Sequence, residues 1–210
     1  MKYYRITGGP LSTNTYIMYV GDTGFIVDPG IRLADITSAL KQLGVTNVCF
    51  VIATHGHFDH VFYAGRLCRL LDVGLYMHEL DVDLTSRHRE VAERYYGDVY
   101  EEPGDVMRVY DGMTVKPVKG FEVRVIHTPG HTQGSICVLT GGFLISGDTL
   151  FKGTVGRTDF PESSTSKMRS SLKKLVELPG DLVVLPGHGD VTTLNREKYS
   201  NPYVRGLLNT

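Results

Sequence analysis

The 210-residue sequence predicts an α/β protein in which helices cover β-sheet. One observation is an alternation of elements: a helix over 35–43, an apolar strand over 48–53, a helix over 61–71 and a strand over 74–77. Another is that histidines and carboxylates follow several expected strands, at the edge where open α/β sheets place their sites. A third is that both halves place strands ahead of a helix, which suggests a pseudo-symmetric sandwich. This length suits one domain covering residues 1–210.

The remaining elements follow from the same periodicity and turn signals. Strands are expected over 3–7, 15–20, 24–27, 106–110, 122–126, 135–140, 142–146 and 182–185, and helices over 81–96 and 164–178. Residues 101–120 are expected to be rich in turns. The tail over 194–210 is expected to form a short helix or an extension on the surface.

Composition excludes several classes of function. The charges balance, with 22 Lys and Arg against 23 Asp and Glu, so the electrostatic attraction that drives nucleic-acid binding is missing. The three cysteines, Cys49, Cys68 and Cys137, lie in apolar segments and are expected to be buried thiols. Neither a signal sequence nor an 18-residue apolar run is present. We therefore expect a cytoplasmic protein that binds neither nucleic acid nor membrane, and the sequence leaves its oligomeric state open.

The most informative stretch is Thr54–His60, which places His55, His57, Asp59 and His60 directly after an apolar strand. In a chain of this composition, His-x-His-x-Asp-His arises by chance roughly once in a thousand sequences. Alternate residues of extended backbone share a face, so His55 and His57 project to the same side. One short loop can therefore direct two ligands at one metal ion and two at a second.

Other candidates also follow expected strands. His131 comes after the Pro129-Gly130 turn, Asp148 after strand 142–146, and His188 after strand 182–185. Asp28, at the end of strand 24–27, is either a carboxylate that orients a ligand histidine or an ordinary turn residue.

Three histidines are not expected to be ligands. His127 still lies in the phase of its strand, where it packs or forms a hydrogen bond. His78 and His88 have no potential ligand at short spacing and are expected at the surface or at the start of a helix.

These residues, in this order and rough spacing along nearly the whole chain, resemble the metallo-β-lactamase superfamily. The resemblance implies an αββα sandwich of two mixed sheets flanked by helices, with the site on its edge. It also implies that Asp148 bridges two metal ions and that Asp59 and Asp148 take part in catalysis. One ion is then held by His55, His57 and His131, and the other by Asp59, His60 and His188.

Within that superfamily the chain is similar to glyoxalase II, the hydroxyacylglutathione hydrolases, in the compact prokaryotic form without a helical C-terminal domain. Asp148 stands where the best-known lactamase branches carry Cys or Ser or omit the ligand. The segments 147–151 and 197–203 also resemble this branch. Arg157 falls where glyoxalase II has a basic residue that binds glutathione; alternatively it pairs with Asp159 and holds its loop.

The resemblance implies a dinuclear hydrolase of thioesters such as S-(hydroxyacyl)glutathione, in which a metal-bridging hydroxide attacks the carbonyl. The imidazole and carboxylate ligands suit Zn²⁺ and admit Fe or Mn, because no Cys enforces zinc. Two other functions stay open. The segment 156–160 also resembles the persulfide dioxygenases of the superfamily, which use one iron, and a non-catalytic metal-binding module is the third possibility.

Overall fold

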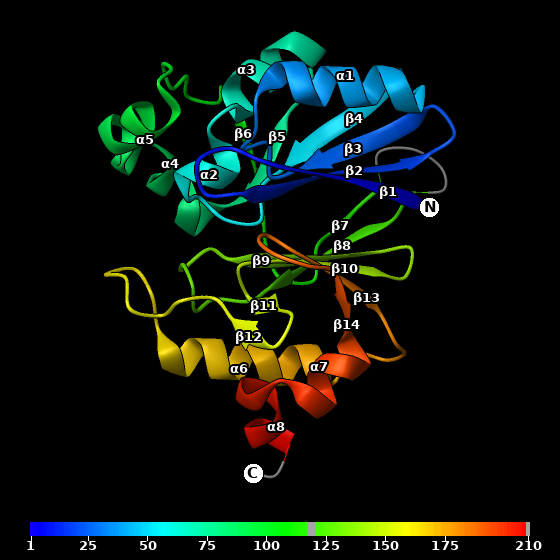
Figure 1. Cartoon of the computed structure of the whole chain (residues 1–210), viewed down its shortest axis with the longest axis vertical. Coiled ribbons are helices and arrows are strands. Elements are labelled where there is room, and N and C mark those ends of the chain that lie inside the picture. The colour runs from blue at the N-terminus through cyan, green and yellow to red at the C-terminus, as the bar shows by residue number, and fades with distance from the viewer. Residues whose placement is uncertain (117–120, 209–210) are drawn as a thin grey trace. The chain divides into compact units, whose positions relative to one another are not determined.

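The computed structural model describes residues 1–116 and 121–208 (Figure 1). The chain divides into two compact units, Met1–Val109 and Tyr110–Thr210, each built from one mixed sheet and its helices. The expected fold class, α/β with two mixed sheets flanked by helices, is confirmed. That the two units act as a single domain stays a prediction.

The sheet of the first unit has six strands in the order β1-β2-β3-β4-β5-β6. Its first three strands are antiparallel neighbours, and the pairs from β3 to β6 are parallel. Parallel neighbours need crossover connections, which the helices supply. The strands are β1 (Lys2–Gly8), β2 (Thr13–Val20), β3 (Thr23–Val27), β4 (Asn47–Ile52), β5 (Leu75–His78) and β6 (Val106–Val109).

Helices α1 (Leu33–Leu43) and α3 (Ala64–Leu71) cover one face of this sheet. Ile36 and Leu40 of α1 and Leu67 of α3 are buried against Ile26 and Val51 of the strands. The helix α1 ends where Gly44 adopts a left-handed conformation with φ of 67°, as its sequence predicts. The first unit thus has its own apolar core between these two helices and the sheet.

Two helices that periodicity predicts as continuous are interrupted. The helix expected over 61–71 starts three residues earlier as α2 (Phe58–Val61), breaks at Tyr63, and resumes as α3. The helix expected over 81–96 is a 3₁₀ turn, η1 (Glu79–Asp81), followed by α4 (Leu84–Arg87) and α5 (Arg89–Tyr96), which meet at His88. At the first break the Tyr63 N–H donates to the Pro29 carbonyl, and in the second segment Asp81 and Leu84 pack against Gly56, so tertiary contacts compete with the helical period there.

The sheet of the second unit has the strand order β14-β13-β10-β9-β8-β7, in which only the β10–β13 pair is parallel. The segments β11 and β12 form a small separate hairpin. The strands are β7 (Thr114–Val115), β8 (Val123–His127), β9 (Ile136–Thr140), β10 (Phe143–Gly147), β11 (Leu150–Phe151), β12 (Thr154–Val155), β13 (Val183–Pro186) and β14 (Thr192–Thr193).

Three helices complete the second unit: α6 (Thr165–Val176), α7 (Leu194–Ser200) and α8 (Pro202–Leu208). The tail therefore folds into two short helices rather than an extension, and the Thr193 hydroxyl caps α7 by accepting a hydrogen bond from the Arg196 N–H. The two-residue strand β7 lies in the segment 101–120, for which turns and short β segments are expected, whereas β11, β12 and β14 were not expected. Residues 117–120 of the expected turn-rich segment and 209–210 of the tail lie outside the described residues.

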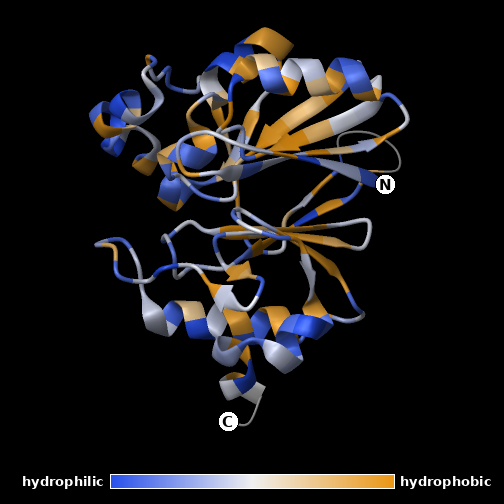
Figure 2. Cartoon of the chain, viewed as in Figure 1, coloured by the Kyte–Doolittle hydropathy of each residue, from blue (hydrophilic) through white to orange (hydrophobic). Residues whose placement is uncertain are grey.

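Apolar residues concentrate on the strands β3, β4, β8 and β9, whereas α7 is mostly hydrophilic (Figure 2). In the second unit Met168, Leu172 and Leu175 of α6 pack with Ile126 and Leu144 of the sheet. No helix among the described residues combines the length and the apolar character that crossing a bilayer requires.

Candidate metal centre

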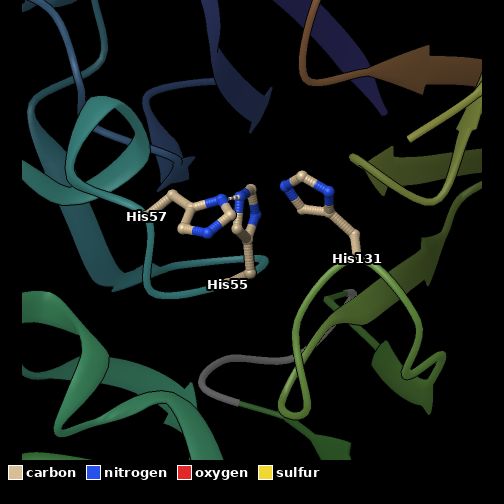
Figure 3. A group of neighbouring side chains, drawn as sticks. All are labelled: His55, His57 and His131. Atoms are coloured by element: carbon tan, nitrogen blue, oxygen red, sulfur yellow. Dashed lines mark hydrogen bonds between the residues drawn. The ribbon is translucent and has the colours of Figure 1, made fainter. Parts of the chain in front are cut away.

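The loop after β4 brings two histidine nitrogens to one point. Nε2 of His55 and Nδ1 of His57 lie 3.2 Å apart, and their rings meet edge to face (Figure 3). Between them, Gly56 is packed so closely that an added Cβ would lie 2.5 Å from the Asp81 carbonyl oxygen. Glycine at position 56 thus lets the loop pass tightly while both imidazoles face the same side, as the alternation predicts.

The tautomer of His55 is set by its neighbours. The Thr54 hydroxyl donates to Oδ2 of Asp28 at 2.7 Å, and Oγ1 of Thr54 lies 3.1 Å from Nδ1 of His55. Because the hydroxyl proton is already given to Asp28, the Thr54 oxygen accepts from Nδ1–H of His55. Nε2 of His55 is then unprotonated, which is the form that binds a metal ion.

Asp28 also contacts the last histidine of the motif. Its Oδ2 lies 2.9 Å from Nδ1 of His60, and both side chains are buried. On its other side, Nε2 of His60 lies 3.4 Å from Oδ2 of Asp59. Asp28 thus occupies the position of a carboxylate that orients a ligand histidine, and His60 and Asp59 form a second pair of potential ligands.

Sequence reasoning missed two residues that hold this loop. The Asp81 carboxylate accepts a hydrogen bond from the Gly56 N–H at 2.9 Å, and the Thr13 hydroxyl donates to Oδ2 of Asp59 at 2.7 Å. Both side chains are buried. Neither residue lies near the motif in sequence, so only the fold reveals these contacts.

The second unit gathers three further candidates around one carboxylate oxygen. Oδ2 of Asp148 lies 3.4 Å from Nε2 of His131 and 3.6 Å from Nε2 of His188. His131 lies on the loop between β8 and β9 (Figure 3), and His188 follows β13. The N–H of Gly187 donates to the Gly147 carbonyl at 2.9 Å, which keeps the ends of β10 and β13 together.

The backbone around His131 is tightly supported. Nδ1 of His131 lies 2.9 Å from the carbonyl oxygen of Arg157, an arrangement that turns Nε2 toward Asp148. An added Cβ on Gly156 would lie 1.8 Å from the Asp148 carbonyl oxygen and 3.3 Å from Nδ1 of His131. The Ser171 hydroxyl donates to the Pro129 carbonyl at 2.7 Å, which fixes the turn ahead of His131 from α6.

Arg157 pairs with Asp159, which is the second of the two roles that the sequence leaves open for it. Its Nε and Nη2 donate to the two carboxylate oxygens of Asp159 at 2.9 Å each, and its guanidinium lies 4.4 Å from the centre of the Phe160 ring. The paired Asp159 carboxylate raises the pKa of Arg157, and the guanidinium lowers that of Asp159. A direct role for Arg157 in substrate binding stays a prediction.

The histidines that sequence reasoning set aside lie elsewhere. His127 ends β8, with Nε2 2.9 Å from the Gln133 carbonyl oxygen. His78 caps η1 by accepting from the Leu80 N–H and is buried rather than at the surface, whereas His88 is exposed at the junction of α4 and α5. All three cysteines are free thiols; Cys68 and Cys137 are buried as expected, whereas Cys49 is only partly buried.

The donors of each unit suit a divalent ion. Ligand atoms about 2.0–2.1 Å from a tetrahedral ion lie about 3.3–3.4 Å apart, close to the separations of 3.2–3.6 Å within the four pairs described. All the donors are imidazole nitrogens or carboxylate oxygens. Burial raises the pKa of the Cys68 and Cys137 thiols to about 11, and no cysteine belongs to the ligand groups of the described residues.

Comparisons with known proteins agree with this chemistry. The chain is 33% identical to the hydroxyacylglutathione hydrolase GloC of Haemophilus influenzae, over 85% of this chain and 86% of that protein. Among solved structures, the chain is similar to TTHA1623, described as a crystal structure in a di-iron-bound form. The two sequences are 34% identical, and the TM-score is 0.83 over 95% of this chain and 99% of that chain. The BLEG-1 B3 metallo-beta-lactamase is 27% identical, also with a TM-score of 0.83, over 97% and 99% of the two chains.

A comparison with protein-family models identifies the family to which the chain belongs. Residues 8–188, which include all seven candidate ligands, match the model of the metallo-beta-lactamase superfamily. The chain therefore belongs to the metallo-beta-lactamase superfamily and has its fold.

Proposed function

We propose that the protein is a dinuclear metal-dependent hydrolase of thioesters, with S-(hydroxyacyl)glutathione as the representative substrate. The ligands of one ion are His55, His57 and His131, those of the other are Asp59, His60 and His188, and Asp148 is shared by both.

The observation that carries this proposal is the placement of the Asp148 carboxylate. Its Oδ2 lies within 3.4 Å of His131 and within 3.6 Å of His188, which belong to different ligand sets in the proposal. A carboxylate next to one proposed ligand of each set supports the assignment of Asp148 as the shared ligand. A thiolate or hydroxyl at position 148 would not offer two equivalent anionic oxygens.

Two divalent ions, when bound, lower the pKa of a shared water to near neutrality and polarise the carbonyl that the water attacks. The chain's own residues prepare this chemistry. Thr54 and Asp28 hold His55 and His60 through their Nδ1 atoms, so that Nε2 of each ring faces the other potential ligands, and the Thr13 hydroxyl fixes the Asp59 carboxylate. Ligands held in place before the ions bind lose little freedom when they do.

A thioester is the substrate class that fits best, for two reasons. A thiol has a pKa of about 8.5, so a thiolate leaves without a strong general acid. In addition, GloC, whose name states hydroxyacylglutathione hydrolysis, matches this chain over most of both sequences. The substrate is therefore a small thioester whose thiol carrier resembles glutathione. Zn²⁺ suits these donors, and iron or manganese is compatible with them.

The test combines metal analysis with assays on a panel of thioesters, esters, lactones and β-lactams. We expect two ions per chain and a preference for thioesters. One iron per chain with oxygen consumption on a persulfide would replace the proposal with a dioxygenase. Preferred hydrolysis of β-lactams would assign a lactamase, and stoichiometric metal without activity on any substrate would leave a metal-binding module.

A further inference from the structure

The second unit has a cavity of about 490 Å³ that none of the proposed ligand side chains lines. It is bounded by the segment 154–158, by α6 and by α8. Its apolar lining includes Met168, Leu172 and Leu207, all buried. A cavity of this size, lined by both apolar side chains and polar groups, is a candidate site for a small molecule.

The polar lining of this cavity is cationic. Arg157 and Arg169 line it together with hydroxyl side chains such as Thr165 and Tyr203, and none of its lining residues is an Asp or Glu. Arg157 is already paired with Asp159. The Arg169 guanidinium, in contrast, forms no ion pair within residues 1–116 and 121–208. Arg169 is therefore the cation available to an anionic ligand, which a carboxylate or phosphate would satisfy.

The cavity adjoins the ligands that the second unit supplies. Gly156 and Arg157 line it. The same two residues also contact the ligands, because the Arg157 carbonyl oxygen lies 2.9 Å from Nδ1 of His131 and Gly156 packs against the backbone of Asp148. A flexible arm two or three residues long spans about 7–10 Å when extended. The path from the ligands to the cavity crosses the rim formed by segment 156–158, whose residues contact both.

We propose that this cavity receives the carrier arm of the thioester, and that Arg169 binds a carboxylate at the end of the arm remote from the sulfur. The inference rests on the proposed thioester hydrolysis and names the residue that selects carboxylate-bearing carriers. Arg157 supports the rim through Asp159 and Phe160, and Arg169 reads the charge. Because Arg169 is exposed, the contact is screened by salt.

The first test measures binding without turnover. S-methylglutathione, which has no thioester to cleave, is titrated into the purified protein by calorimetry. We expect Arg169→Ala to weaken binding about 5- to 20-fold, with the loss shrinking as salt rises. The matched control is Arg205→Ala, which removes an exposed guanidinium of α8 that does not line the cavity, and it should bind like the wild type.

A second variant tests the cavity rather than the charge. An added Cβ at Gly206, which lines the cavity on α8, would meet no atom within 4 Å, so Gly206→Phe has room for its first atoms and can fill the space. We expect it to weaken S-methylglutathione binding as well. Three results would overturn the proposal. The wild type does not bind the probe, or Arg169→Ala and Gly206→Phe both bind it like the wild type, or Arg169→Ala and Arg205→Ala lose affinity equally.

Kinetics separate this inference from the function on which it rests. With a glutathione thioester, Arg169→Ala should raise KM and leave kcat nearly unchanged. With the N-acetylcysteamine thioester of the same acyl group, which lacks the carboxylate, KM and kcat of the variant should equal those of the wild type. Equal losses on the two substrates would contradict a carboxylate-reading role. If the wild type hydrolyses neither thioester, the proposed function fails, while calorimetry still decides whether the cavity binds the arm.

Discussion

Oδ2 of Asp28 lies 2.9 Å from Nδ1 of His60, and neither side chain is accessible to solvent. The same carboxylate accepts hydrogen bonds from the N–H and the hydroxyl of Thr54 at 2.7 Å each. Asp28 itself adopts a left-handed conformation with φ of 52°, which non-glycine residues rarely do. A strained residue whose carboxylate meets three donors is held by its surroundings, and it fixes the orientation of His60.

Asp28→Asn tests this relationship. Asparagine tolerates the left-handed backbone and keeps the size of the side chain, but it removes the charge that orients Nδ1–H of His60. We expect the affinity for metal to fall about 10- to 100-fold, as is typical when the carboxylate behind a ligand histidine is lost. Competition with a chelator measures the change. Asp35→Asn, on the exposed surface of α1, is the control, and equal affinities in the two variants would contradict the assignment.

Asp148→Ala should remove the dinuclear centre and not merely the activity. In the proposal this carboxylate is shared, so both ions lose a ligand at once. Elemental analysis of the purified variant should give a metal content per chain well below that of the wild type. Two ions per chain in this variant would show that Asp148 is not the bridging residue.

Strand ends were the most predictable feature of this chain. The apolar runs before His55 and Asp148 end where β4 and β10 end, to within about one residue, because a buried strand needs a continuous apolar stretch. The side on which His55 and His57 project also follows from alternation alone, and their nitrogens converge to 3.2 Å.

The supports of the site were not predictable in the same way. The contacts of Thr13 with Asp59 and of Asp81 with Gly56 join residues 46 and 25 positions apart. A sequence pattern reports the face on which a residue lies but not which distant loop packs there. The segment 81–96 was expected to be one helix, but its first part packs against the loop at Gly56 through Asp81 and Leu84, a contact that the sequence does not reveal.

His127 and His131 lie four residues apart and should behave differently. His127→Ala should retain bound metal, because Nε2 of His127 lies 2.9 Å from the Gln133 carbonyl and the residue ends a strand. His131→Ala should lower the affinity for the ion assigned to His55 and His57, because it removes the nitrogen next to Asp148. Metal titration of both variants checks this, and a reversed order would show that the strand phase had been misassigned.

The last prediction concerns Asp81, whose carboxylate accepts from the N–H of Gly56 at 2.9 Å. That N–H lies between the two histidines whose nitrogens converge, and the Asp81 side chain is buried. Removing the acceptor leaves a buried donor unsatisfied, which costs about 1–3 kcal/mol, and the loop can lower that cost by turning. Turning would separate Nε2 of His55 from Nδ1 of His57. Asp81→Ala should therefore weaken metal binding.

Two comparisons distinguish positioning from simple stabilisation. Asp81→Asn keeps an oxygen that accepts from Gly56, so it should retain most of the metal affinity that Asp81→Ala loses. Asp83→Ala removes an exposed carboxylate two residues further on, which makes no capping hydrogen bond, and should bind metal like the wild type. Metal affinity and the melting temperature of the metal-free protein are measured for all three variants. If Asp81→Ala lowers the melting temperature but binds metal as tightly as the wild type, Asp81 stabilises the fold without positioning the ligands. Weaker metal binding that Asp81→Asn restores, and that is larger than the fall in melting temperature accounts for, assigns Asp81 to the positioning of the ligand loop.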